Sequence, residues 1–123
     1  MSVPRLNSVV LDCPDPRALS AFYADLLDWT PRGDPDPENG WATIAGPGGV
    51  LIEFQRATDY RPPTWPDPER QQMFHLDLTV DDLDAAHDRA VALGARPLDD
   101  QKSFRVYADP AGHPFCLVRE TAQ

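Results

Sequence analysis

A pattern that occurs twice is the feature that most constrains how this chain can fold. The stretches SVVLDCPDPRALSAFYADLLDW and HLDLTVDDLDAAHDRAVALGA both begin with alternating apolar and polar residues, which predicts a strand. In both, an aspartate follows, and then apolar residues at helical spacing. We therefore expect Asp15 and Asp82 to cap the first turn of a helix, and Gly94 to end the second helix.

Strand-like segments also follow both predicted helices. They are expected at residues 30–32, 41–45, 50–55, 96–98, 104–108 and 114–119. The fold class predicted is α+β, with two βαβββ modules at about 4–57 and 73–120 and a proline-rich connector at 58–72. Modules of this length are marginal as separate cores, so a single domain spanning 1–123 is expected.

Strand alternation predicts which side chains share a face. From Phe74 onward every second residue is apolar, and this face is expected to cover the helix that follows. The last strand of each module can be phased in the same way. The faces turned away from the helices are then expected to carry Ser8, Glu53, Gln55, His75, Asp77 and Cys116. If the two sheets curve around a common cavity, these side chains point into it.

The ordered set SVVLDCPDPRALSAFY, HLDLTVDDLDAA and DPAGHPFCLV resembles the small glyoxalase-like proteins of the vicinal oxygen chelate superfamily. That superfamily includes glyoxalase I, bleomycin-resistance proteins and extradiol dioxygenases. The resemblance covers nearly the whole chain. It implies two paired βαβββ modules that form an incomplete barrel around a cavity, usually in a homodimer.

The resemblance also implies where a metal would bind. In metal-dependent members the ligands lie on the first and last strands of each module, and these positions correspond to Ser8, Glu53, His75 and Cys116. Glu53 and His75 match the pattern, and they are the expected metal-binding and catalytic residues. A neutral serine is a poor ligand, and a thiolate suits Zn²⁺ better than a hard cation. Two good ligands are fewer than the three of a catalytic zinc site, which favours a metal-free cavity.

Further side chains are candidates for contacts with a small-molecule substrate. They are Trp41, Gln55, Trp65, Asp77, Tyr107 and Cys116. Core packing explains the aromatic residues equally well, and Cys116 fits a small core residue better than a nucleophile. Glu53 is a candidate general base, because partial burial is expected to raise its pKa.

Charge narrows the possible partners. The formal net charge is −9, which argues against nucleic acid and against an anionic membrane surface. The start of the chain does not resemble a signal peptide, and no apolar run is long enough to span a bilayer, so a cytoplasmic protein with reduced cysteines is expected.

The expected function is binding of a small organic molecule in the cavity, without a complete metal site. One alternative is a lyase, isomerase or dioxygenase that uses Zn, Ni, Mn or Fe held by His75 and Glu53, with Gln55, Cys116 or a partner subunit as the source of a further ligand. Another is a drug-binding or structural dimer. Glyoxalase I activity itself is not expected.

Overall fold

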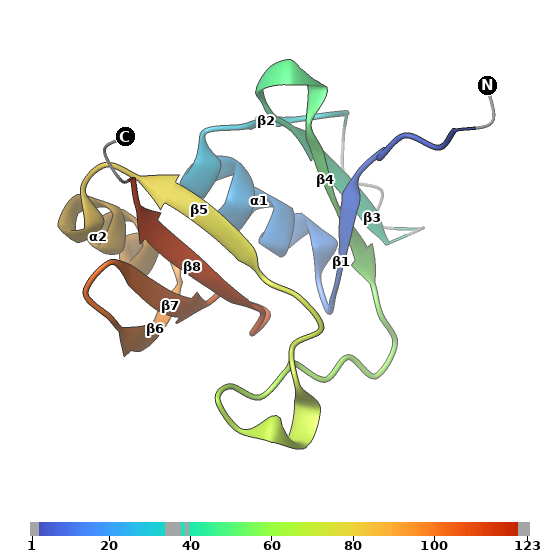
Figure 1. Ribbon diagram of the computed structural model, residues 1–123. Coiled ribbons are helices and arrows are strands. Elements are labelled where there is room, and N and C mark those ends of the chain that lie inside the picture. Colours follow the sequence, from blue (N-terminus) through green and yellow to red (C-terminus); the bar gives the residue numbers. More distant parts are fainter. Residues whose placement is uncertain (1–2, 34–37, 39, 121–123) are drawn as a thin grey trace. The chain divides into compact units, whose positions relative to one another are not determined.

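The computed structural model describes residues 3–33, 38 and 40–120 and has the predicted α+β class. The chain divides into two units, Met1–Tyr60 and Arg61–Gln123. Each unit has the order βαβββ (Figure 1). The elements are β1 (Val9–Cys13), α1 (Pro16–Leu27), β2 (Thr30–Pro31), β3 (Trp41–Ala45) and β4 (Leu51–Arg56), then β5 (Leu76–Val80), α2 (Leu83–Leu93), β6 (Arg96–Asp100), β7 (Phe104–Ala108) and β8 (Pro114–Arg119).

Each unit has one open, mixed sheet. The strand orders are β1-β4-β3-β2 in the first unit and β5-β8-β7-β6 in the second. In both sheets the first and last strands of the unit pair in parallel, and the other neighbours are antiparallel. The first and last strands therefore lie side by side at the same place in both sheets, and this adjacency positions the candidate residues.

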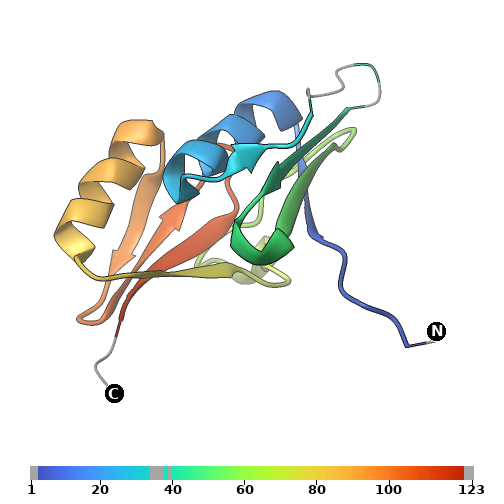
Figure 2. The same ribbon diagram turned by 90° about the horizontal axis from the view of Figure 1, so that it is seen from above.

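In the first unit, α1 packs on one face of the sheet (Figure 2). Asp15 caps this helix by accepting hydrogen bonds from the N–H groups of Arg17 and Ala18, as predicted. The helix buries Tyr23, whose ring stacks on Phe54 of β4 with the ring centroids 5.9 Å apart. Alternate residues of β4 thus face the helix and form the core.

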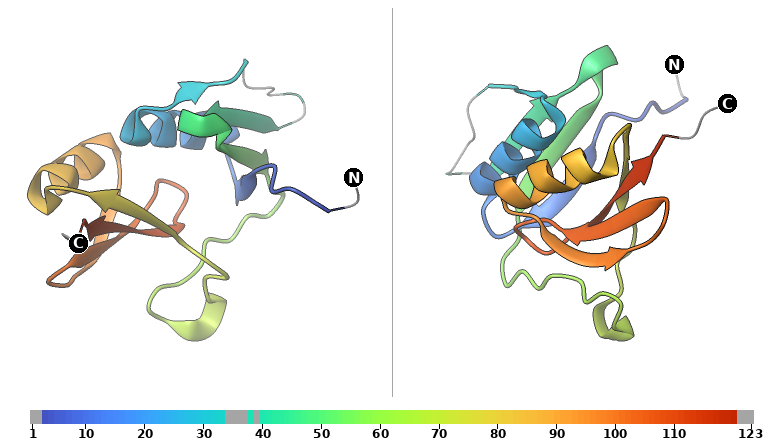
Figure 3. Two further views of the ribbon diagram at one scale, coloured as in Figure 1. Left: turned by 45° about the horizontal axis from the view of Figure 1, so that its top comes forward. Right: turned by 90° about the vertical axis from the view of Figure 1, so that its left-hand side faces the viewer.

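In the second unit, α2 lies along one face of the sheet (Figure 3). Asp82 caps its first turn, and Gly94 ends it in the left-handed conformation at φ 119°, as predicted. On the helix side of this sheet, Tyr107 and Phe115 are fully buried and stack with their centroids 5.5 Å apart.

The expected strands are all present, with one correction at the start of the second unit. Phe74 was expected to belong to the apolar face of the strand, but β5 begins only at Leu76. Phe74 lies two residues before this strand and is 61% exposed. Within the described part of the chain, no helix has the length and apolar character needed to cross a membrane.

Candidate functional site

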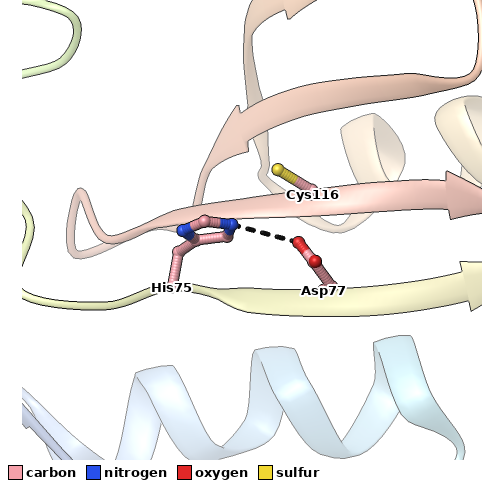
Figure 4. Close-up of side chains that lie close together, drawn as sticks. All are labelled: His75, Asp77 and Cys116. Carbon is pink, nitrogen blue, oxygen red and sulfur yellow. Dashed lines mark ion pairs between the residues drawn. The ribbon is translucent and has the colours of Figure 1, made fainter.

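The second unit brings three of the candidate side chains together. The parallel pairing of β5 with β8 sets Asp77 directly opposite Cys116. Phe115, the neighbour of Cys116, points to the helix side, so Cys116 and Asp77 lie on the other face. His75 comes just before β5, two residues from Asp77, and therefore extends to the same side (Figure 4).

His75 and Asp77 form a close pair. His75 Nε2 lies 3.1 Å from Asp77 Oδ1, and the two side chains are 37% and 62% exposed (Figure 4). Cys116 is only 8% exposed. One ligand atom from each of the three residues lies within 4.8 Å of the others. The imidazole of His75, the carboxylate of Asp77 and the thiol of Cys116 therefore lie close together where the buried core meets the surface.

These residues form one edge of a pocket of about 410 Å³, called here the second-unit pocket. Its lining consists of Trp65, Gln72, His75, Asp77, Phe104, Val106, Pro114, Cys116 and Val118. The volume lies within the range of roughly 300–1,000 Å³ that is usual for small-molecule sites. The walls are mostly hydrocarbon and aromatic. The side-chain oxygen of Gln72 is buried and has no hydrogen-bond partner among the described residues.

Cys116 is a protonated thiol at neutral pH. Burial, and after it the nearby Asp77 carboxylate, which also accepts a hydrogen bond from the thiol, together raise its pKa to about 11. A thiol must lose its proton to act as a nucleophile. The position therefore agrees with the expectation that Cys116 is not a nucleophile.

The first unit surrounds Glu53 with hydrogen-bond donors of its own. Ser8 Oγ donates to Glu53 Oε2 at 2.5 Å, while Trp41 Nε1 and Thr43 Oγ1 donate to Oε1 at 3.1 and 3.0 Å. The hydrogen bond from Ser8 is the main cause that lowers the pKa of Glu53, against the opposing effect of burial. The expected rise in this pKa is therefore wrong, because three donors outweigh partial desolvation.

The remaining predicted residues lie in different places. Trp65 lines the second-unit pocket. The indole N–H of Trp41 donates a hydrogen bond to Glu53, and Gln55 is exposed on β4. Tyr107 does not share the face of His75: it lies on the helix side of its sheet, with its hydroxyl 2.8 Å from His87 Nδ1. Glu53 belongs to the first unit and His75 to the second, so their pairing stays a prediction.

Sequence reasoning missed part of the pocket lining. The residues that it did not name are Gln72, Phe104, Val106, Pro114 and Val118. Strand register could have found four of them. Val106 pairs with Cys116, and Phe104 lies two residues before Val106 on the same face of β7. Pro114 and Val118 lie two residues on either side of Cys116 on the same face of β8. Gln72 lies in the connector, where no periodic pattern reveals where a side chain points.

The donor set of His75, Asp77 and Cys116 fits a borderline-soft divalent cation. Nitrogen, carboxylate oxygen and thiolate are all zinc ligands, with bonds of roughly 2.0–2.3 Å. Tetrahedral geometry then needs ligand atoms about 3–4 Å apart. The three ligand atoms lie within 4.8 Å of one another, which is close to this spacing. Ser8 and Glu53 fit a metal less well, since the serine hydroxyl already donates to the carboxylate.

The model of a family described as glyoxalase-like domain matches residues 8–118. The chain belongs to this family. The match spans both βαβββ units, in agreement with the resemblance noted in the sequence. No curated protein matches the glyoxalase-like chain significantly.

Solved structures share the fold of this glyoxalase-like domain at low sequence identity. A glyoxalase/bleomycin resistance protein/dioxygenase family enzyme from Burkholderia phytofirmans PsJN has a TM-score of 0.74 at 18% identity, over 94% of this chain and 98% of that one. A glyoxalase/dioxygenase from Nostoc punctiforme has a TM-score of 0.72 at 17% identity, over 98% and 94%.

A third similar structure is a mutant of the fosfomycin resistance protein FosX from Listeria monocytogenes, in complex with Mn(II) and 1S,2S-dihydroxypropylphosphonic acid. Its TM-score is 0.72 at 15% identity, over 97% of this chain and 92% of that one. At such identities the likeness establishes the fold, which is that of the vicinal oxygen chelate superfamily, and leaves the ligand open.

Proposed function

We propose that this glyoxalase-like protein binds a small organic molecule in the second-unit pocket and needs no metal to do so. The observation that carries the proposal is the pocket itself, which combines hydrocarbon walls with one polar edge. Ligand sites commonly combine apolar walls, which supply affinity, with a few polar groups that fix orientation.

Each part of the lining has a role in this proposal. Trp65 and Phe104 provide aromatic surface for the body of the ligand. The pair His75–Asp77, 3.1 Å apart, orients polar groups of the ligand at the edge. Cys116 forms an uncharged part of the lining, because its pKa is raised to about 11.

The test is to fill the pocket and ask whether ligands are lost. Val118 lines the pocket and is half-buried, so Val118→Trp places a large ring in the cavity. Val91→Trp is the matched control, since Val91 is 41% exposed on α2 and lies outside the pocket lining. Fragments that raise the melting temperature of the wild type should act equally on Val91→Trp and not on Val118→Trp. An unchanged response of Val118→Trp would contradict the proposal, as would a wild type without any fragment that binds at millimolar concentration.

A metal-dependent lyase, isomerase or dioxygenase is the second candidate. The observation that favours it is the cluster of His75, Asp77 and Cys116, whose ligand atoms lie within 4.8 Å of one another. A bound divalent ion would supply Lewis acidity toward oxygen atoms of a substrate. These three residues would hold it from one face of one sheet.

Elemental analysis distinguishes the two candidates. The purified, untagged protein is analysed as isolated and after incubation with Zn²⁺, Ni²⁺ or Mn²⁺, beside His75→Ala. One equivalent of metal in the wild type and none in His75→Ala would favour the metal-dependent enzyme. Fragment binding that persists in metal-free protein favours the first proposal.

The arrangement of the two modules as one domain, their assembly into a homodimer and a cytoplasmic location stay predictions of the sequence analysis. Light scattering of the purified protein measures the oligomeric state directly. A mass of two chains would agree with the predicted homodimer.

A further inference from the structure

The chemistry of the second-unit pocket also indicates what kind of molecule it selects. We infer that its ligand is an apolar, preferably aromatic, compound that carries a protonated amine. This inference rests on the proposed function, because it specifies the ligand of the same site.

Charge is the first argument. Asp77 is the one acidic side chain among the residues that line the pocket, and the lining contains neither lysine nor arginine. The basic neighbour of Asp77 in the lining is His75, whose Nε2 lies 3.1 Å from Asp77 Oδ1 and which is charged only when protonated. A carboxylate without a permanently charged partner in the lining attracts a cation and repels an anion. The net charge of −9 over the whole chain adds a long-range attraction for cations.

Hydrogen bonding is the second argument. The lining contains a buried acceptor, Gln72 Oε1, that has no partner among the described residues. An unsatisfied buried acceptor costs free energy, and a ligand N–H group removes that cost. The thiol of Cys116 donates to the Asp77 carboxylate, and His75 Nε2 lies 3.1 Å from Asp77 Oδ1. Gln72 Oε1, in contrast, has no donor in the described part of the chain, and because the atom is enclosed by the protein a ligand N–H group reaches it only when the Gln72 side chain rotates toward the pocket.

The aromatic walls are the third argument. Trp65 and Phe104 line the same pocket as Asp77. The face of an aromatic ring attracts a cation, and tryptophan does so most strongly. An ammonium group on an apolar body therefore satisfies all three features, whereas a carboxylate or phosphate satisfies none of them.

Three probes that differ only in their polar group test the inference. They are 2-naphthylmethylammonium, 2-naphthylmethanol and 2-naphthoate, and binding is measured by titration calorimetry at about 0.15 M salt, where long-range attraction is largely screened. The ammonium should bind about tenfold more tightly than the alcohol, as one charge-assisted hydrogen bond would produce. The naphthoate should bind most weakly.

Variants locate the effect within the pocket. Asp77→Asn should cost the ammonium about tenfold in affinity and leave the alcohol unchanged, because it removes a charge and keeps the shape. Gln72→Met should cost the ammonium roughly threefold, the size of a single neutral hydrogen bond. Asp81→Asn is the matched control: Asp81 is exposed just after β5, outside the lining, and its loss should change no affinity.

Three outcomes would overturn the inference. Alcohol binding equal to ammonium binding, with both lost in Val118→Trp, would remove the preference for an amine and leave the pocket as a binding site. An equal loss of ammonium binding in Asp81→Asn and Asp77→Asn would show that surface charge causes the preference. Failure of all three probes would exclude this ligand class, while the fragment screen decides separately whether the pocket binds other molecules.

Discussion

The two units place equivalent residues on equivalent sheet faces and use them differently. Glu53 in β4 and Cys116 in β8 have the same register position, opposite Thr43 and Val106 respectively. In the first unit the central residue is a carboxylate, and Ser8, Trp41 and Thr43 all donate to it. The polar groups of that face are thus largely satisfied by one another.

In the second unit hydrocarbon replaces most of these donors. Phe104 and Val106 stand at the positions of Trp41 and Thr43, and His75 stands at the position of Ser8. The carboxylate of this face belongs to Asp77 on the neighbouring strand β5, and the Asp77 side chain is 62% exposed. Hydrocarbon walls beside an exposed acid form a pocket. The repeated fold thus sets the positions, while the choice of residue decides whether the polar groups of a face bond to one another, as in the first unit, or line a pocket, as in the second.

The largest expected effect tests whether the cores of the units are equivalent. Phe54 and Phe115 are fully buried and stack on Tyr23 and Tyr107 respectively. Phe54→Ala and Phe115→Ala should each lower the free energy of unfolding by about 3–5 kcal/mol, through lost burial and a residual cavity. Urea denaturation followed by circular dichroism measures the loss. A loss below about 1 kcal/mol in either variant would contradict the equivalence of the two cores.

The second effect concerns the thiol that replaces the carboxylate. With a pKa of about 11, Cys116 should be alkylated about a hundredfold more slowly at pH 8 than an ordinary free thiol. Its rate should rise about tenfold for each pH unit up to pH 11. Mass spectrometry of iodoacetamide-treated protein measures the rate at this residue, and Asp77→Asn should increase it, because a nearby negative charge is removed. Rapid labelling of folded protein at pH 7 would contradict the prediction.

Much of this fold could be predicted because its signals are local. Helix caps at Asp15 and Asp82, a glycine stop and strict alternation all depend on neighbours in sequence, and the structure has each of them. The same alternation correctly placed Cys116 and Phe115 on opposite faces of β8, with Phe115 on the helix side. Local rules therefore established both the elements and the faces that they present.

The site was harder to predict, because it depends on contacts across strands and on the connector. The pKa of Glu53 was expected to rise with burial, and three donors from other segments reverse its direction. Tyr107 was assigned to the cavity, although its position on β7 alternates with Val106 and faces the helix. Gln72 follows no periodic pattern. The face of Tyr107 could have been read from the alternation along β7, whereas the donors to Glu53 and the position of Gln72 depend on contacts between segments that residue spacing does not reveal.

The third effect sharpens the contrast between the two carboxylates. Glu53→Ala should lower the free energy of unfolding by about 1–3 kcal/mol, because Ser8, Trp41 and Thr43 lose their common acceptor. Asp77→Ala should change it by less than about 0.5 kcal/mol, since Asp77 is 62% exposed. Urea denaturation of both variants at pH 7 provides the comparison. Equal losses would mean that the second-unit carboxylate is as structural as the first.

The smallest effect is the pH dependence of the Glu53 network, because only part of its energy depends on charge. The folded-state pKa of Glu53 lies below its ordinary value of 4.5, mainly through the hydrogen bond from Ser8. A depressed pKa means that the unfolded chain binds the proton more readily. The stability that the ionised group contributes is therefore complete above pH 4.5 and is lost as pH falls through the lower folded value.

The difference in unfolding free energy between wild type and Glu53→Gln should consequently stay constant from pH 7 to about 5.5 and shrink from there to pH 3. Ser8→Ala removes the strongest cause of the depressed pKa. In that background the decline should be smaller and should end at a higher pH, because the folded-state pKa of Glu53 moves up toward the unchanged unfolded value. Urea denaturation at successive pH values follows both differences. If the difference in unfolding free energy were the same at pH 7 and pH 3, the three donors would recognise the shape of the Glu53 side chain and not its charge. The proposed contrast between the carboxylate of the first unit, whose charge is satisfied within the protein, and that of the second unit, available to a ligand, would then fail.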